Sequence, residues 1–315
     1  MSAGPSGLPL VVEEHRHLLS LAYRMLGTMA EAEDAVQETY VRWYRMTEAE
    51  RAAVLNPAAW CTRVASRVCL DVLASARHRR ERYVGEWLPE PVPADLFAGT
   101  GSGAPAATSD PFDHVSLDES VSTAVLVVME AMTPAERVAF VLHDVFALPF
   151  AEIAETVGRT PAAVRQLATS ARRRVREHGA VVRDRRAHDD VARAFAHAAR
   201  TGDLDALAAL LDPAVTLRSD GGGVVGAARR PVLGADDVAR FLLGIARKDP
   251  HLTMEPVRTG DGLAFRVVHR GPDGDALRGL LGLHVVDGRV RDVWLQVNPH
   301  KLTAWDGGPA PQARP

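Results

Sequence analysis

The stretch from Phe150 to Val175 constrains the fold of this chain more than any other segment. Its sequence, FAEIAETVGRTPAAVRQLATSARRRV, places the small Ala154 where two helices can cross closely, and Gly158 where the turn between them needs a positive φ. Apolar side chains recur where a seam between the two helices must close, at Ile153, Val157, Val164 and Leu167. These offsets together predict a helix-turn-helix.

The second helix of this motif has a well-defined start and a polar, basic surface. Thr160 is a suitable N-cap and Pro161 suits the first helical position. A capping box would place Glu at position 163, but Ala163 stands there, so the positive end of the helix dipole is open to a phosphate. The side chains expected to reach base edges are Arg165, Gln166 and Thr169, with Arg172, Arg173 and Arg174 farther along toward the DNA backbone.

An arginine run alone is often only a solvated helix end, and it is the preceding turn pattern that favours DNA binding here. The net charge of -3 does not oppose this, because charge is distributed unevenly along the chain. One basic block spans residues 77–82 and another 159–186, whereas residues 31–38 are acidic.

The chain divides into segments of different character. Residues 11–84 carry apolar side chains at helical spacing, residues 85–116 are rich in Pro, Gly, Ala and Ser and form a linker, and residues 117–180 are helical again and contain the helix-turn-helix. Residues 188–305 begin with one or two helices and continue with strand-like runs at 214–218, 263–269, 280–286 and 290–297. Asp-Gly turns are expected at 261–262 and 287–288. The predicted fold is multidomain, with two all-α domains followed by an α+β domain.

Composition sets further limits. A chain of 315 residues can hold two or three domains. It shows no secretion signal and no apolar run of membrane-spanning length, so we expect a cytoplasmic protein with no membrane partner. Cys61 and Cys69 are eight residues apart on one expected helix, too far apart for a disulfide, and should be buried thiols. No zinc-site spacing is present, and we expect neither a metal nor a cofactor.

The two helical segments resemble regions 2 and 4 of an extracytoplasmic-function sigma factor, the minimal form of the sigma-70 family. AEAEDAVQETYVRWYRM is similar to the region 2 helix that docks on the clamp helices of the RNA polymerase β′ subunit. The resemblance implies promoter DNA and core RNA polymerase, including its β flap, as partners, with region 4 on the −35 element. The implied core-binding residues are Asp34, Gln37, Glu38, Tyr40 and Val41.

The segment NPAAWCTRVASRVCLDVLASARHRRERY resembles the part of region 2 that captures and melts the −10 element. Melting requires a grip on extruded bases and on phosphates, which aromatic and basic side chains supply. Taken singly, Trp60 could equally be a core aromatic and the arginines a solvated face. The implied −10 residues are Asn56, Trp60, Arg63, Arg67, Arg77, Arg79 and Arg80.

The last segment resembles the SnoaL-like, NTF2-type cone fused to one class of these sigma factors. Three short motifs carry this resemblance: Trp87-Leu88-Pro89-Glu90-Pro91, Ser219-Asp220-Gly221-Gly222-Gly223 and Asn298-Pro299-His300-Lys301-Leu302. The resemblance implies that the extension contacts the linker and the sigma core and tunes promoter binding. The residues expected to make these contacts are Trp87, Leu88, Pro89, Asp220, Gly221, Gly222, Asn298, Pro299 and Lys301. Trp87 could instead cover only a local apolar patch.

Two alternatives stay open at this point. SnoaL-like cones can hold acid/base residues, and Asp220, His251, His269 and His284 are candidates, but their spacing fixes no dyad, so we expect no enzyme. Residues 253–268 also lack the Asn-Gly and Pro-Gly pairs expected of the subgroup, which places the pocket in question more than the fold. The second alternative is a one-component helix-turn-helix regulator with a ligand-sensing domain, usually dimeric on a palindromic site. The region 2 pattern favours the sigma factor, which we expect to be a monomer when free.

Overall fold

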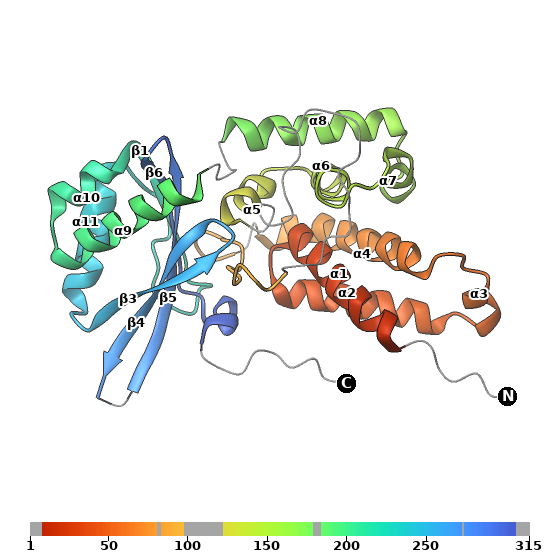
Figure 1. Ribbon diagram of the computed structural model, residues 1–315, viewed down its shortest axis with the longest axis horizontal. Coiled ribbons are helices and arrows are strands. Elements are labelled where there is room, and N and C mark those ends of the chain that lie inside the picture. The colour runs from red at the N-terminus through yellow and green to blue at the C-terminus, as the bar shows by residue number, and fades with distance from the viewer. Residues whose placement is uncertain (1–7, 81–82, 98–121, 179–183, 273, 307–315) are drawn as a thin grey trace. The chain divides into compact units, whose positions relative to one another are not determined.

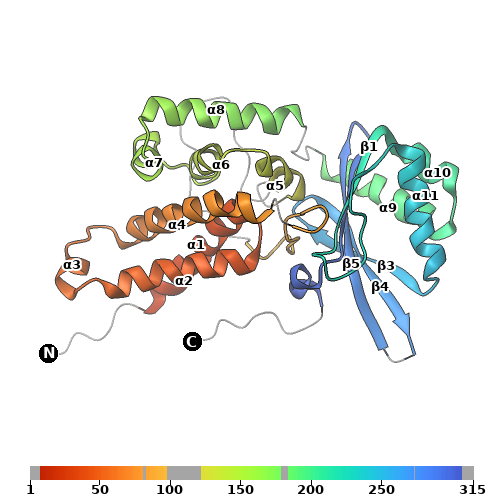
Figure 2. The ribbon, with the colours of Figure 1, turned by 180° about the vertical axis from the view of Figure 1, so that it is seen from behind.

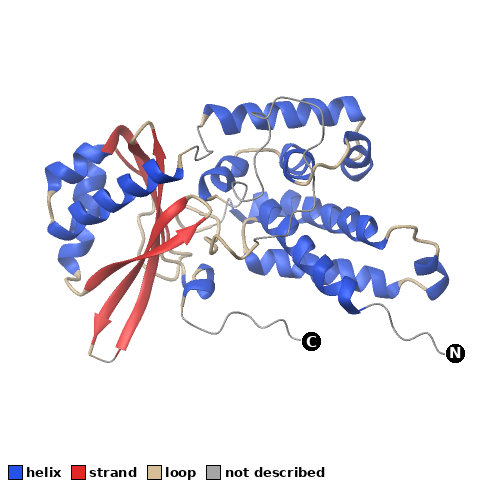
Figure 3. Cartoon of the chain, viewed as in Figure 1, coloured by secondary structure: helices blue, strands red, loops and turns tan. Residues whose placement is uncertain are grey.

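The structure is a computed structural model that describes residues 8–80, 83–97, 122–178, 184–272 and 274–306, with the backbone alone at 8–13 and 76–80. The described residues form two compact units. The first unit contains residues 8–79, 97 and 128–178, and the second contains residues 80, 83–96, 122–127 and 184–306. Within the described ranges the first unit is helical, and every strand belongs to the second (Figure 3).

The first helical segment consists of α1 (Leu8–Leu26), α2 (Met29–Arg45), α3 (Glu48–Ala52) and α4 (Pro57–Arg80). Short polar side chains start three of these helices. The Thr28 hydroxyl accepts the backbone N–H of Glu31, Thr47 and Glu50 form a full capping box, and Asn56 Oδ1 accepts the N–H of Ala59. Cys61 and Cys69 are free thiols buried in this helical core, as predicted, and burial raises the pKa of Cys61 to about 11.

The second helical segment contains α5 (Thr123–Glu130), α6 (Pro134–Phe140), a π-helical turn η3 (Val141–Val145), α7 (Phe150–Val157) and α8 (Pro161–Glu177). The predicted helix-turn-helix is confirmed. Gly158 ends α7 with φ of 68°, and the Thr160 hydroxyl caps α8 by accepting the Ala163 N–H at 3.2 Å. The predicted helix start near residue 117 lies outside the described residues.

A buried arginine joins the two helical segments within the first unit. Arg137 of α6 donates to the carbonyl of Met25 at the end of α1 (2.8 Å), to the carbonyl of Met129 (3.0 Å), and to the Glu130 carboxylate (2.6 Å). Burial lowers the pKa of the Arg137 guanidinium to about 9. Because each of these acceptors is fixed in the fold, the guanidinium holds α6 against α1 in this state.

The second unit contains a six-stranded sheet, the helices α9, α10 and α11, and the first residues of α5 (Figure 1). The elements in chain order are α9 (Arg185–Thr201), α10 (Leu204–Leu210), β1 (Leu211–Asp220), β2 (Val232–Leu233), α11 (Ala235–Lys248), β3 (Leu252–Thr259), β4 (Gly262–Gly271), β5 (Gly274–Val286), β6 (Arg289–Gln296) and two 3-10 turns, η4 (Pro299–Lys301) and η5 (Thr303–Trp305). The strand order is β2-β1-β6-β5-β4-β3, antiparallel except for the parallel β1–β6 pair. The expected α+β domain is confirmed.

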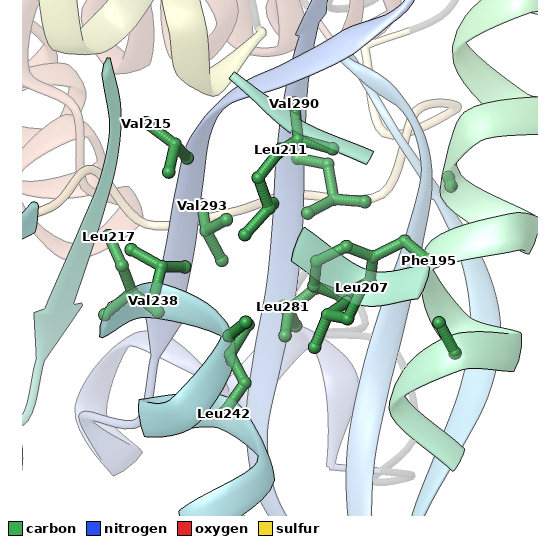
Figure 4. Close-up of a cluster of buried hydrophobic side chains, with 14 of the residues drawn as sticks. Phe195, Leu207, Leu211, Val215, Leu217, Val238, Leu242, Leu281, Val290 and Val293 are labelled. Atoms are coloured by element: carbon green, nitrogen blue, oxygen red, sulfur yellow. The ribbon is translucent and has the colours of Figure 1, made fainter. Parts of the chain in front are cut away.

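The helices of this unit cover one face of the sheet, as the view from behind also shows (Figure 2). Figure 4 shows Phe195 of α9 and Leu207 of α10 beside Leu281 of β5, within an apolar core that also contains Val238 and Leu242 of α11. Asp189 fixes the start of α9 to the β3–β4 hairpin, since its carboxylate accepts the Leu263 N–H (2.9 Å) and pairs with Arg258. The apolar core therefore lies between these helices and the sheet.

Sequence reasoning located some strands and missed others. Three of the predicted runs lie within β1, β4 and β5, and the fourth extends one residue beyond the end of β6 at Gln296. The turn at Asp287-Gly288 forms with φ of 50° and 75°. The other hairpin pairs Thr259 with Gly262, so its loop is Gly260-Asp261, one residue earlier than predicted. Strands β2 and β3 and helix α11 were not predicted. In β3, Pro256 interrupts the alternation of Leu252 and Met254 with polar residues. Helix α11 does carry Val238, Leu242 and Ile245 at helical spacing, a signal that was available in the sequence.

Candidate nucleic-acid interface and linker-binding site

Helix α8 presents one polar face and buries the other. Val164, Ala168, Ala171 and Val175 pack inward at helical spacing. The opposite face exposes Arg165, Gln166, Thr169 and Arg173, together with Thr160 at the helix start. The Arg165 guanidinium lies over the Phe150 ring at 5.2 Å, which restrains it beside the helix-turn-helix. The predicted base-reading side chains thus share one exposed surface.

Arg172 differs from the other predicted DNA contacts. Its guanidinium forms an ion pair with Asp144, whose side chain is fully buried, so it points into the domain rather than away from it. Arg174 is half-exposed and lies 4.0 Å from Glu136. Sequence reasoning treated the arginine run as one surface, but a helical period of 3.6 residues directs successive residues to different sides. Arg172 therefore serves the packing of α8 in this structure.

The candidate −10 residues lie at the start and along one side of α4. Asn56 caps the helix, and Trp60 packs edge to face against Trp43 of α2 with ring centroids 5.0 Å apart. The arginines Arg63 and Arg67 are exposed, and both contact Glu155 of α7, through its carboxylate (3.7 Å) and its backbone carbonyl (3.0 Å). The side chains of Arg77, Arg79 and Arg80 lie outside the described residues.

The candidate core-binding residues separate into two groups. Asp34, Gln37 and Val41 are exposed, and Glu38 beside them forms an i,i+4 ion pair with Arg42 (2.9 Å). Tyr40 instead stacks on His15 of α1, with ring centroids 6.0 Å apart. Two further apolar side chains of this helical segment are exposed, Tyr44 on α2 and Leu55 before α4.

The nine predicted regulatory residues converge in the second unit around a buried ion pair. Asp220 and Lys301 are 0% and 7% exposed, and Lys301 Nζ lies 2.8 Å from Asp220 Oδ2. Lys301 also donates to the Leu88 carbonyl (2.6 Å) and lies over the Trp87 ring at 4.2 Å. The Lys301 ammonium group thus binds the linker at Trp87 and Leu88.

Asp220 accepts further hydrogen bonds that bind the linker and its own loop. The donors are Tyr83 Oη (2.6 Å), the Leu88 N–H (3.0 Å) and the Gly222 N–H (3.0 Å). Burial, together with the hydrogen bond to the Asp220 carboxylate, raises the pKa of Tyr83 well above its ordinary value. Tyr83 therefore acts as a neutral donor, and the buried carboxylate is surrounded by donors as its charge requires.

Gly221 and Gly222 allow the segments of this site to pack closely, and Asn298 packs directly against Gly222. A side chain at Gly221 would come within 2.5 Å of the Val225 carbonyl, and Gly222, with φ of 63°, has the Asn298 amide where its Cβ would be. Asn298 donates to Tyr83 Oη (3.1 Å) and caps η4, which starts at Pro299 and carries Lys301. The two motifs therefore pack as one surface beneath residues 83–91.

Further contacts of the second unit were not predicted. Trp305 Nε1 donates to the Pro91 carbonyl (2.7 Å), and Gln296 Nε2 lies 3.4 Å from the Pro89 carbonyl. Asp261 accepts the N–H groups of Thr123 and Ala124 (2.8 and 3.1 Å), so it caps the start of α5. The cap is supplied by a residue 137 positions away in sequence, and a search for local capping residues could not find it.

The four acid/base candidates do not lie together in one site. Asp220 is occupied by the linker, His284 pairs with Asp292 (3.0 Å), and His269 pairs with Asp249 (2.7 Å) beside His251. The pocket between the helices and the sheet is lined by none of these four residues. None of the helices that the structure describes is long and apolar enough to cross a bilayer.

Comparison with known proteins identifies both helical segments. Residues 10–79 match the family model for sigma-70 region 2, and residues 122–175 match the model for sigma-70 region 4. The arrangement of the two regions around a linker is that of a sigma-70-type transcription factor.

Relatives extend this match over the whole chain. The chain is 40% identical over 307 residues to the ECF RNA polymerase sigma factor SigJ of Mycobacterium tuberculosis H37Rv, covering 95% of this chain and 93% of that protein. It is 37% identical over 295 residues to the probable ECF sigma factor SigI of the same species, covering 91% and 92%. The crystal structure of M. tuberculosis SigJ matches with a TM-score of 0.70 and 36% identity over 94% of this chain and 98% of that one. The chain therefore belongs to the ECF RNA polymerase sigma factors.

Replacing Lys301 by Met leaves the Asp220 carboxylate buried without its cation, which costs about 3 to 5 kcal/mol when a buried pair is broken. We expect K301M to raise the rate of amide hydrogen exchange at Leu88 at least tenfold, measured by mass spectrometry of peptides spanning residues 84–92. D220N/K301M should recover part of this protection, because neither charge is then left alone.

The control is R240M, which removes an exposed i,i+4 pair with Asp236 in the same unit and should leave this exchange unchanged. Exchange in K301M equal to that of the unmodified protein would show that the ion pair does not hold the linker.

Proposed function

We propose that this sigma factor reads the −35 promoter element with the exposed face of α8. The observation that supports this proposal is the alignment of Arg165, Gln166 and Thr169 on one exposed face near the start of a helix. Arginine and glutamine supply the paired donors and acceptors that base edges in the major groove require. We assign Thr160, Arg173 and Arg174 to the phosphate backbone and Arg172 to the support of the helix.

Arg165→Ala should cost about 1 to 3 kcal/mol of −35 binding and relax the preference at one base position, whereas Arg173→Ala should weaken binding evenly across sequences. The measurement is in vitro transcription with core RNA polymerase, using the DNA upstream of the gene and a set of single-base −35 substitutions.

The matched control is Arg172→Ala, which removes the ion pair of Arg172 with the buried Asp144 carboxylate. It should lower the melting temperature of the protein and keep the −35 base preference. If Arg165→Ala leaves base preference intact while Arg172→Ala changes it, the proposed face is wrong.

We infer that core RNA polymerase contacts the exposed side of α2, with the β′ clamp helices as the site on the enzyme and the β flap as the site for region 4. Asp34, Gln37, Glu38 and Val41 follow one another at helical spacing on that side. Tyr44 extends the same surface with an exposed ring. A mixed surface of this kind offers an apolar centre with charged flanks, as protein interfaces do. Tyr40 supports the helix from the α1 side.

Val41→Glu and Asp34→Arg should each weaken binding of the protein to core RNA polymerase by at least tenfold, measured by fluorescence anisotropy with labelled protein. Each change places an unmatched charge in the proposed interface. Glu48→Arg makes the same charge change at an exposed position of α3, outside the proposed surface, and should bind almost normally. Equal losses in all three variants would mean a general charge effect and no defined face.

The proposed −10 surface includes Asn56, Trp60, Arg63, Arg67, Arg77, Arg79 and Arg80. In this structure Arg63 and Arg67 are engaged by Glu155 of the helix-turn-helix. Promoter phosphates would compete with Glu155 for the same guanidinium groups. This competition links release of region 4 from α4 to the loading of DNA.

We further propose that the C-terminal domain tunes promoter output through its hold on the linker and does no chemistry. The contacts of Asp220 and Lys301 with residues 83–91 support the first part, and the dispersal of the acid/base candidates supports the second. Because the chain carries its own regulatory surface, we propose that it is a monomer when free.

A further inference from the structure

The C-terminal domain contains a cavity of about 760 Å³ between its helices and its sheet. Strands β3, β4, β5 and β6 form one wall, and α9 and α11 form the other. This volume lies within the range of small-molecule binding sites in proteins. The proposed contacts with polymerase, promoter and linker use none of its residues.

The cavity is apolar over most of its surface. The sheet contributes Leu263, Phe265, Val267, Leu281 and Leu295, and the helices contribute Phe195, Leu242 and Ile245. A cavity with such a lining offers water few hydrogen-bond partners, so it favours an apolar ligand. Only four of the described lining residues have polar side chains, and none of these four is acidic.

Three of the four polar side chains are basic, and all three come from α9. Arg193, His197 and Arg200 are spaced four and three residues apart, so they share one side of the helix, and each is exposed. They therefore line the mouth of the cavity and leave its floor apolar. A ligand that matches both the basic mouth and the apolar floor has an apolar body and an anionic end.

Arg200 is the basic side chain best placed to bind that anion. Arg193 already pairs with Asp190 (2.6 Å), and Arg200 has no acidic partner among the described residues. Arg200 Nη2 lies 3.2 Å from His197 Nδ1, which must accept this hydrogen bond and thereby positions the guanidinium. The remaining N–H groups match the two oxygens of a carboxylate.

We propose that this cavity binds an amphipathic monocarboxylate of the fatty-acid type, with the carboxylate at Arg200 and the apolar chain between α9, α11 and the sheet. A neutral or cationic molecule of the same length lacks the group that Arg200 recognises. Absence of a lining carboxylate also removes the competitor that would occupy the guanidinium. Since the described lining residues include no paired acid and base, we expect the site to bind its ligand without transforming it.

The test uses the full chain and three twelve-carbon probes: dodecanoate, dodecan-1-ol and dodecyltrimethylammonium, each below its aggregation concentration. Isothermal titration calorimetry should show saturable 1:1 binding of dodecanoate, at least about tenfold tighter than either other probe. Arg200→Ala should weaken dodecanoate binding about tenfold and leave dodecan-1-ol binding unchanged. Arg240→Ala removes an exposed arginine of α11 that does not line the cavity and should change neither.

Two cavity-filling variants test whether the apolar part of the ligand binds inside the cavity. Ala196→Trp on α9 and Met254→Trp on β3 each fill the cavity from a different wall and should abolish binding of both dodecanoate and dodecan-1-ol. Far-UV circular dichroism establishes which of the two variants is folded, and two independent positions keep the test decisive. The proposal is overturned by absence of saturable binding, by equal affinity for all three probes, or by full binding in a folded cavity-filled variant.

Discussion

The buried ion pair between Asp220 and Lys301 is the interaction on which the second unit's hold on the linker depends. Taking either charge from water is costly, and the cost is offset only when the partner and the hydrogen-bond donors are all in place. Here Tyr83, Leu88 and Gly222 supply the donors, and two of those three lie in residues 83–88, at the start of the linker and just before it. Without residues 83–88 the carboxylate would lose two hydrogen bonds, so the docked linker completes the site.

The sheet of this domain has different surroundings on its two faces. Strand side chains alternate, so Leu281 and Leu295 face the cavity while their neighbours Leu280, Gly282, Trp294 and Gln296 face Leu88, Pro89 and Pro91. The hairpin after β3 supplies Asp261 to the first turn of α5. One small sheet thus contacts the chain on both sides of residues 98–121.

Features that depend on residues close together in the sequence could be predicted, and features that depend on contacts between distant residues could not. Local patterns gave the helix-turn-helix, because Gly158, Thr160 and Pro161 act within a few residues of their own positions. The resemblance to a known family supplied the motifs around Asp220 and Lys301, which are 81 residues apart. No local signal could pair Arg172 with Asp144, Trp305 with Pro91 or Asp261 with α5, since these contacts depend on the tertiary fold.

The most direct test of this account is in vitro transcription with core RNA polymerase, comparing the full chain, a chain ending at Asp184, and the full chain carrying Lys301→Met. If the domain regulates through the linker, the full and shortened chains differ in promoter output, and Lys301→Met moves the output of the full chain toward that of the shortened one. Equal output from all three proteins would contradict the account, because the ion pair and the domain it organises would then have no part in transcription.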